Sequence, residues 1–100
     1  MEERKIALVT GASRGIGRAT AVELARTGYF VIINYNASEA AAAETLAQVQ
    51  AAGGSGETRK FDVADAAGVK EVLAAIAQEH KRIDVLVNNA GVTADGLFMM

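Results

Sequence analysis

Three glycines with a distinctive spacing follow a short apolar run near the N-terminus. Gly11, Gly15 and Gly17 come directly after the apolar residues 6–9. A chain that turns from a strand into a helix within a few residues needs backbone angles that a Cβ opposes. A phosphate can approach the unpaired N–H groups and positive dipole end of the helix only where side chains leave room. The spacing therefore predicts a turn that binds the pyrophosphate of a dinucleotide.

The residues after the second apolar run bear on which dinucleotide would bind. A carboxylate about twenty residues past such a loop would hold both ribose hydroxyls of NAD and repel a 2′-phosphate. The neutral residues Asn34, Tyr35 and Asn36 occupy that place, and Arg14 in the glycine loop can attract a phosphate. The sequence therefore predicts NADP rather than NAD, although an arginine in a loop is also commonly a solvated surface charge.

The elements that position these residues alternate along the chain. Apolar runs predict strands, and helical spacing of apolar residues predicts helices that begin at the N-caps Ser38 and Asp65 or end at Gly28. Short connections between alternating elements indicate a parallel sheet with right-handed crossovers. We expect an α/β, Rossmann-type doubly wound parallel sheet, N-terminal portion only, with four strands (6–9, 29–33, 57–63 and 83–87) and three helices (16–27, 39–52 and one after Asp65 that carries Val69, Val72, Leu73 and Ile76).

Composition excludes several classes of protein. The chain has 100 residues, a formal net charge of −2 and scattered basic residues, which argues against a nucleic-acid partner. It has no cysteine and hence no disulfide or thiolate metal site, and no apolar stretch long enough to span a membrane. His80, the only histidine, has no evident metal-ligand partner and is predicted to lie on the surface. We expect a cytoplasmic protein without a metal.

Two motifs together resemble one enzyme family. The spacing Gly-x-x-x-Gly-x-Gly and the Asn-Asn-Ala-Gly stretch at 88–91 are similar to the short-chain dehydrogenase/reductase family. Within it, residues 11–18 and 88–97 are most similar to 3-oxoacyl-[acyl-carrier-protein] reductases, which reduce the β-keto group of a growing fatty acyl chain with NADPH. The resemblance covers essentially the whole chain. It implies NADP as cofactor, a carrier-protein-linked or other ketone as substrate, and a homo-tetramer.

The resemblance also implies a role for individual residues. The loop would line the pyrophosphate and adenosine ribose, Asp62 would accept a hydrogen bond from the adenine amino group, and the Val63 backbone would lie beside the ring. Asp62 could equally tie down the following loop, and Asn88 with Asn89 could simply satisfy backbone groups. The implied cofactor-binding residues are Gly11, Ala12, Ser13, Arg14, Gly15, Ile16, Gly17, Asn36, Asp62, Val63, Asn89, Ala90 and Gly91.

The sequence departs from the family at the catalytic residues. Reduction of a ketone needs a proton donor, and the family uses a tyrosine with a lysine four residues later, assisted by a serine. Neither Tyr29 nor Tyr35 has that lysine. We therefore expect residues 1–100 to be the N-terminal part of a dinucleotide-binding domain that continues outside this chain. The alternatives are a noncatalytic NADP-binding module and a methyltransferase, the latter disfavoured because the ribose-binding acid is missing.

Overall fold

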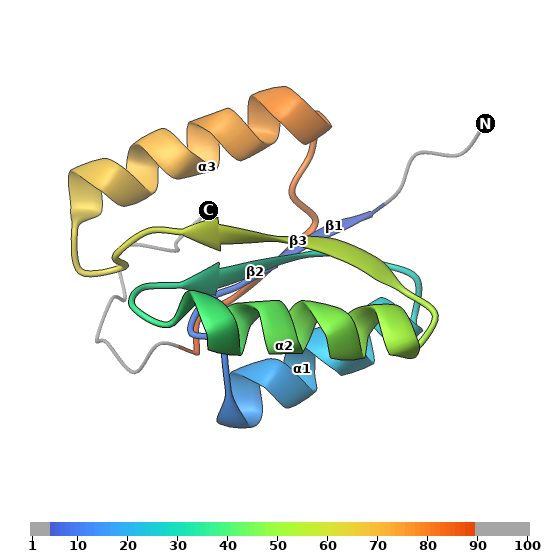
Figure 1. Ribbon diagram of the computed structural model, residues 1–100. Coiled ribbons are helices and arrows are strands. Elements are labelled where there is room, and N and C mark those ends of the chain that lie inside the picture. The colour runs from blue at the N-terminus through green and yellow to red at the C-terminus, as the bar shows by residue number, and fades with distance from the viewer. Residues whose placement is uncertain (1–4, 90–100) are drawn as a thin grey trace.

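A four-stranded parallel sheet with helices on both faces makes up the computed structural model, which describes residues 5–89 (Figure 1). Strands and helices alternate, as the sequence predicts. The elements are β1 (Ile6–Val9), α1 (Gly15–Arg26), β2 (Phe30–Tyr35), α2 (Glu39–Ala51), β3 (Ser55–Lys60), α3 (Ala66–His80) and β4 (Val85–Val87).

The strand order is β3-β2-β1-β4, with every described pair parallel. The chain winds from β1 outward through β2 to β3, and then crosses back to place β4 on the other side of β1. Helices α1 and α2 cover one face of the sheet and α3 covers the other (Figure 1). This is the Rossmann-like arrangement expected from the alternation, and it places a topological switch point between β1 and β4.

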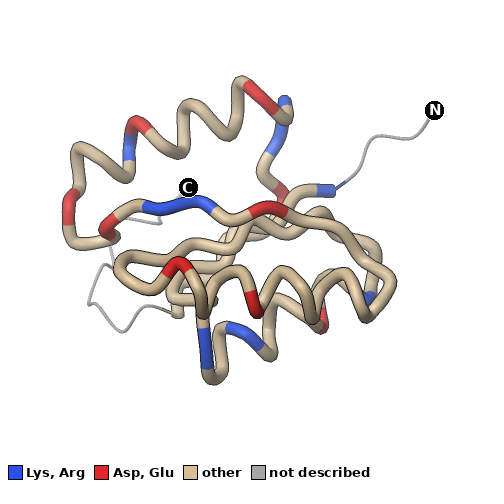
Figure 2. The backbone as a smooth tube through the Cα atoms, in the orientation of Figure 1, with Lys and Arg blue, Asp and Glu red and all other residues tan. Residues whose placement is uncertain are grey.

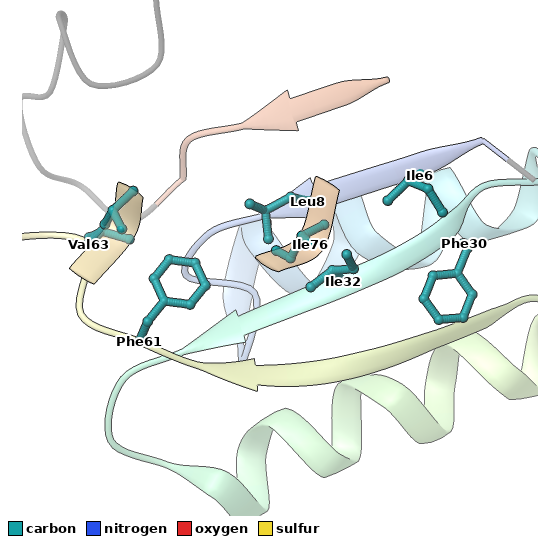
Figure 3. Packing of buried hydrophobic residues seen from close by; sticks show 8 residues of the cluster. Ile6, Leu8, Phe30, Ile32, Phe61, Val63 and Ile76 are labelled. Atoms are coloured by element: carbon teal, nitrogen blue, oxygen red, sulfur yellow. The ribbon is translucent and has the colours of Figure 1, made fainter. Parts of the chain in front are cut away.

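Two hydrophobic clusters lie on opposite faces of the sheet. On the α3 side, Ile76 lies over Leu8 and Ile32 (Figure 3). On the other side, small residues of α1 and α2, including Ala21 and Ala42, pack against β1 and β2. The alternation of neighbouring residues between the two clusters explains why β1 is apolar throughout and buried on both faces.

The predicted ends of two strands are wrong. The second strand was expected to stop at 33, but β2 continues through Asn34 and Tyr35, which pair with β3. The third was expected at 57–63, but β3 ends at Lys60. Phe61 and Val63 are buried beside α3 although they lie beyond the strand. Strand ends depend on pairing with neighbours, which alternation along one segment does not reveal.

The helix ends follow the predicted capping residues. Ser38 accepts a hydrogen bond from the Ala41 N–H at 3.2 Å, and Asp65 accepts one from the Gly68 N–H at 3.1 Å. Gly28 has φ +106°, a conformation that favours glycine, just after α1. Ser38 and Asp65 therefore mark where α2 and α3 begin, and Gly28 marks the turn between α1 and β2.

Charged residues are distributed over several elements (Figure 2), in keeping with the scattered basic residues of the sequence. Among residues 5–89, no helix combines the length and apolar character needed to cross a membrane.

Candidate cofactor-binding site

The carboxyl ends of all four strands meet at one edge of the sheet, where they surround a cleft of about 500 Å³. The glycine loop after β1 forms one wall. The ends of β2 and β3 and Asn89, from the segment after β4, form the others. The lining residues are Gly11, Ser13, Arg14, Asn34, Tyr35, Asn36, Ala37, Ser38, Phe61, Asp62, Val63 and Asn89.

The three glycines of the loop each meet a different demand. Gly11 and Gly15 have φ +60° and +64°, which L side chains rarely adopt. Gly17 lies inside α1, where a Cβ would come within 2.2 Å of the Gly11 carbonyl oxygen. The loop therefore folds back directly onto the first turn of α1, whose N–H groups lack intrahelical partners.

Asn34 joins the glycine loop to the end of β3. Its side chain is buried at 2% exposure, its Oδ1 accepts a hydrogen bond from the Gly11 N–H at 2.9 Å, and its Nδ2 donates to the Phe61 carbonyl at 2.9 Å. The Asn34 carbonyl also accepts a hydrogen bond from the Ala12 N–H. One amide side chain thus sets the spacing of three walls of the cleft.

Thr10 joins the loop to the segment that follows β4. Its buried hydroxyl accepts a hydrogen bond from the Asn89 N–H at 2.9 Å and lies 3.2 Å from Asn88 Oδ1, to which it can donate. The Asn89 side chain donates to the Gly11 carbonyl at 3.4 Å. The structural role considered for the asparagine pair is therefore observed, and Asn89 also lines the cleft.

We call the lining residues Arg14, Asn36 and Ser38 the rim of the cleft near β2; among these three there is one cation and no acid. Arg14 is exposed, is the N-cap of α1 and makes no side-chain cap bond. Asn36 and Ser38, from the segment that leads into α2, line the same cleft. Asp62, from the β3 end, is the acidic residue of the lining. Its Oδ1 accepts a hydrogen bond from the Ala64 N–H at 2.9 Å, so it does tie down the following loop.

The predicted site residues divide into three groups. Gly11, Ser13, Arg14, Asn36, Asp62, Val63 and Asn89 line the cleft, as expected. The others among residues 5–89 do not line it: Ala12 and Gly17 are buried, Gly15 begins α1, and Ile16 is 76% exposed. Ala90 and Gly91 lie outside the described residues.

Several residues of the site were missed from sequence. Ala37, Ser38 and Phe61 were not assigned to the cleft. Asn34 and Tyr35 were considered only as neutral residues where an acid would hold the ribose of NAD, and the hydrogen bonds of Asn34 and Thr10 were not predicted. A polar residue at the end of a buried strand could have indicated Asn34 and Thr10, because buried polar groups must find partners.

A second cluster of charged residues lies away from the cleft, and it corrects the prediction for His80. That side chain is only 16% exposed, its ring lies 5.0 Å from that of Phe30, and its Nε2 lies 3.7 Å from Glu57 Oε1. Glu57, Glu79 and His80 offer metal-ligating atoms within 4.8 Å of one another. However, Arg59 hydrogen-bonds both carboxylates, so the cluster joins β3 to the end of α3 as an ion-pair network.

The ion pairs of this network change two pKa values. The hydrogen bond with Glu79 raises the pKa of Arg59, and the same bond lowers the pKa of Glu79 below its ordinary value of 4.5. Neither group lines the cleft. Their charges therefore bear on stability rather than on ligand binding.

Comparison with known proteins identifies the family. Residues 5–99 match the sequence profile described as short chain dehydrogenase. The chain is 47% identical over 95 residues to the 3-oxoacyl-[acyl-carrier-protein] reductase of Synechocystis sp., covering 95% of this chain and 38% of that protein. It is 44% identical over 89 residues to the short-chain dehydrogenase/reductase homolog YusS of Bacillus subtilis, covering 89% of this chain and 82% of that one.

A solved structure gives the same result. The crystal structure of a metagenomic short-chain oxidoreductase in complex with NADP superposes with a TM-score of 0.83 at 36% identity, covering 90% of this chain and 40% of that one. The chain thus spans well under half the length of the reductase and of the oxidoreductase. With its sheet order, its glycine loop and these matches, the chain belongs to the short-chain dehydrogenase/reductase family.

Proposed function

We propose that this chain binds NADP(H) in the cleft at the carboxyl ends of its strands, with the adenosine half between the glycine loop and the ends of β2 and β3. The observation that carries the proposal is the rim near β2. There Arg14 supplies a positive charge, and Asn36 stands where an NAD-specific protein would carry an acid. The related oxidoreductase crystallised with NADP supports the same choice of cofactor.

The residues of the cleft fit a dinucleotide phosphate. A side chain at Gly11 or Gly15 would be strained by the positive φ, and the loop leads directly into the N-terminus of α1. Such a terminus favours an anion through its free N–H groups and dipole. Asp62 and Val63 lie at the end of β3, where we propose that the adenine binds.

We also propose that the protein of which this cleft is a part reduces a ketone, in the manner of 3-oxoacyl-[acyl-carrier-protein] reductases. Bound NADPH would supply a hydride from its nicotinamide ring. The residues described here would bind the phosphates and the adenosine and orient the cofactor. The names of relatives such as the Synechocystis reductase support this substrate class. The proton donor, a tetrameric assembly and a cytoplasmic location stay predictions.

Fluorescence titration with NADPH and with NADH tests the cofactor proposal. We expect saturable binding of NADPH with an affinity at least about tenfold higher than for NADH, because a single charge-assisted contact to the 2′-phosphate contributes about 1.5–3 kcal/mol. Equal affinity for the two dinucleotides, or binding of neither, would contradict it. Titration in the presence of excess inorganic phosphate, which lacks the adenosine, controls for nonspecific attraction of phosphates to Arg14.

The second candidate is a noncatalytic NADP-binding module. Within residues 1–100 neither tyrosine has a lysine four residues later, a pair that such a module would not need. An assay of NADPH oxidation with a 3-oxoacyl substrate, run on the protein of which this cleft is a part, separates the two. Binding of NADPH without any turnover favours the module, whereas turnover of the substrate favours the reductase.

A further inference from the structure

Arg18, in α1, does not line the cleft but hydrogen-bonds both the glycine loop and the first turn of α2. From α1, its Nη2 donates to the Ser13 carbonyl at 2.7 Å and to the Ala41 carbonyl at 3.0 Å. Its Nε donates to the Thr45 hydroxyl at 2.9 Å. A planar guanidinium can hold acceptors in such fixed directions, whereas a lysine ammonium cannot satisfy all of them with the same geometry.

Thr45 extends this contact to the preceding residue of the loop. It is fully buried in α2, and its hydroxyl accepts from Arg18 and lies 2.8 Å from the Ala12 carbonyl, to which it can donate. Two consecutive loop carbonyls, those of Ala12 and Ser13, are therefore each bonded to this pair. We call Arg18 and Thr45 the loop clamp.

The loop clamp determines the orientation of the backbone next to Arg14. The Ser13 carbonyl belongs to the peptide that joins Ser13 to Arg14, and a trans peptide is planar with its N–H opposite to its carbonyl. Fixing the carbonyl therefore fixes the start of Arg14. It also engages two oxygens whose partial negative charge would otherwise be free to repel a phosphate.

The other side of the loop clamp reaches the first turn of α2. Arg18 donates a hydrogen bond to the Ala41 carbonyl. The Ala41 N–H in turn donates one to the side chain of Ser38, which lines the cleft. One arginine thus links the backbone of Arg14 on one wall to Ser38 on the other. The distance between these two walls sets the width of the rim.

We infer that Arg18 and Thr45 are positioning residues for recognition of the cofactor's 2′-phosphate, although neither lines the cleft. The inference rests on the proposed binding of NADP(H). Loss of the loop clamp frees the backbone at Arg14 and the start of α2, which are the parts of the rim that distinguish NADPH from NADH. The Gly11 end of the loop keeps its hydrogen bond to Asn34, so the site for the pyrophosphate is less affected.

Two pairs of variants test the inference. Thr45→Val removes the hydroxyl while keeping the shape, and Thr45→Ser keeps the hydroxyl. The two substitutions at arginine are Arg18→Met, which removes the guanidinium, and Arg26→Met, which removes an arginine of the same helix whose side chain pairs with the exposed Glu23. Each variant chain is titrated with NADPH and with NADH, and its folding is checked by circular dichroism.

We expect Thr45→Val and Arg18→Met to lower NADPH affinity roughly tenfold and NADH affinity less, so that the ratio of the two affinities falls. Thr45→Ser and Arg26→Met should keep the ratio of the unaltered chain. A variant that is partly unfolded loses both affinities by the same factor, so the ratio still reports positioning.

An unchanged ratio in both Thr45→Val and Arg18→Met would overturn the inference while leaving the proposed function intact, provided that the unaltered chain prefers NADPH. Failure of the unaltered chain to bind either dinucleotide would instead overturn the proposed function, and the inference with it.

Discussion

Asn36 stands at the point of the cleft where one charge can change the choice of dinucleotide. It is exposed, it lines the same cleft as Arg14, and it follows the last residue of β2. Two unit charges 4 Å apart interact by about 1 kcal/mol in water and about 4 kcal/mol near a protein surface. A carboxylate at this position would therefore weaken binding of a 2′-phosphate.

We predict that Asn36→Asp lowers NADPH affinity roughly tenfold or more, and leaves NADH affinity unchanged or higher because the new carboxylate can accept from both ribose hydroxyls. Fluorescence titration with the two dinucleotides measures both effects. Asn36→Ser, which is polar and neutral, is the matched control and should keep the preference for NADPH. The same loss for both dinucleotides in Asn36→Asp would contradict this account of the rim.

At the scale of single elements, α1 depends on the absence of a side chain at Gly17. Replacement of glycine by alanine inside a helix normally stabilises a protein by about 0.5–1 kcal/mol. At this position the new Cβ would come within 2.2 Å of the Gly11 carbonyl oxygen and 2.6 Å of the Asn89 side-chain nitrogen. The backbone of the loop cannot give way cheaply.

We therefore predict that Gly17→Ala destabilises the protein by about 1–3 kcal/mol, opposite in sign to helix propensity. The free energy of unfolding in urea measures the effect. Ala19→Gly, at an exposed position of the same helix, is the control and should cost up to about 1 kcal/mol through propensity alone. A more stable Gly17→Ala variant would show that the loop does not pack on α1 as described.

The start of α3 depends on its cap. Asp65 accepts a hydrogen bond from the Gly68 N–H, which would otherwise lack a partner within the helix. We predict that Asp65→Ala lowers the free energy of unfolding by about 1 kcal/mol. Glu71 is an exposed acid of the same helix that caps nothing, so Glu71→Ala should change the free energy of unfolding by less than about 0.5 kcal/mol. Equal losses in the two variants would refute the assigned cap.

The same elements show what the sequence could predict. Glycines, caps and apolar runs act locally, so the three helices, β1 and the glycine loop were found nearly at their observed bounds. The hydrogen bonds of Asn34 were not predicted because its partners Gly11 and Phe61 are distant in sequence. His80 was misjudged because its surroundings come from β2 and β3. Arg18 was overlooked because its partners in α2 are apparent only once the helices pack together.

At the scale of the whole molecule, the carboxylates of Asp84 and Glu79 each join segments that are distant in sequence. Asp84 Oδ2 accepts a hydrogen bond from the Ile6 N–H at 2.7 Å and the carboxylate also accepts from Arg82. The Arg82 hydrogen bond, followed by that of Ile6, lowers the pKa of Asp84 below its ordinary value of 3.8. The Arg59 bond lowers that of Glu79 in the same direction.

A lowered pKa in the folded state makes stability depend on pH in a defined direction. The stabilising contribution of each carboxylate is fully present above its ordinary pKa and is lost as the pH falls through the lower, folded-state value. We predict that the contributions of these two groups to the melting temperature stay constant from neutral pH down to their ordinary values of 4.5 and 3.8, and then decline.

Thermal unfolding followed by circular dichroism across this range measures the effect. Asp84→Asn should lower the melting temperature at neutral pH and flatten the decline in acid, because its side chain no longer titrates. Curves for Asp84→Asn and the unaltered chain that run parallel through the acid range would contradict the assigned pKa shift of Asp84.

The central claim is that NADP(H) binds at the carboxyl ends of the strands, and residue-resolved NMR of the chain titrated with NADPH tests it most directly. We predict that backbone amide signals of Gly11, Ser13, Asn36 and Asp62 shift in a saturable manner, whereas those of Gly28 and Gly53, in the turns that precede β2 and β3 at the opposite edge of the sheet, stay in place. Shifts centred on Gly28 and Gly53, or no shift at saturating NADPH, would contradict the account.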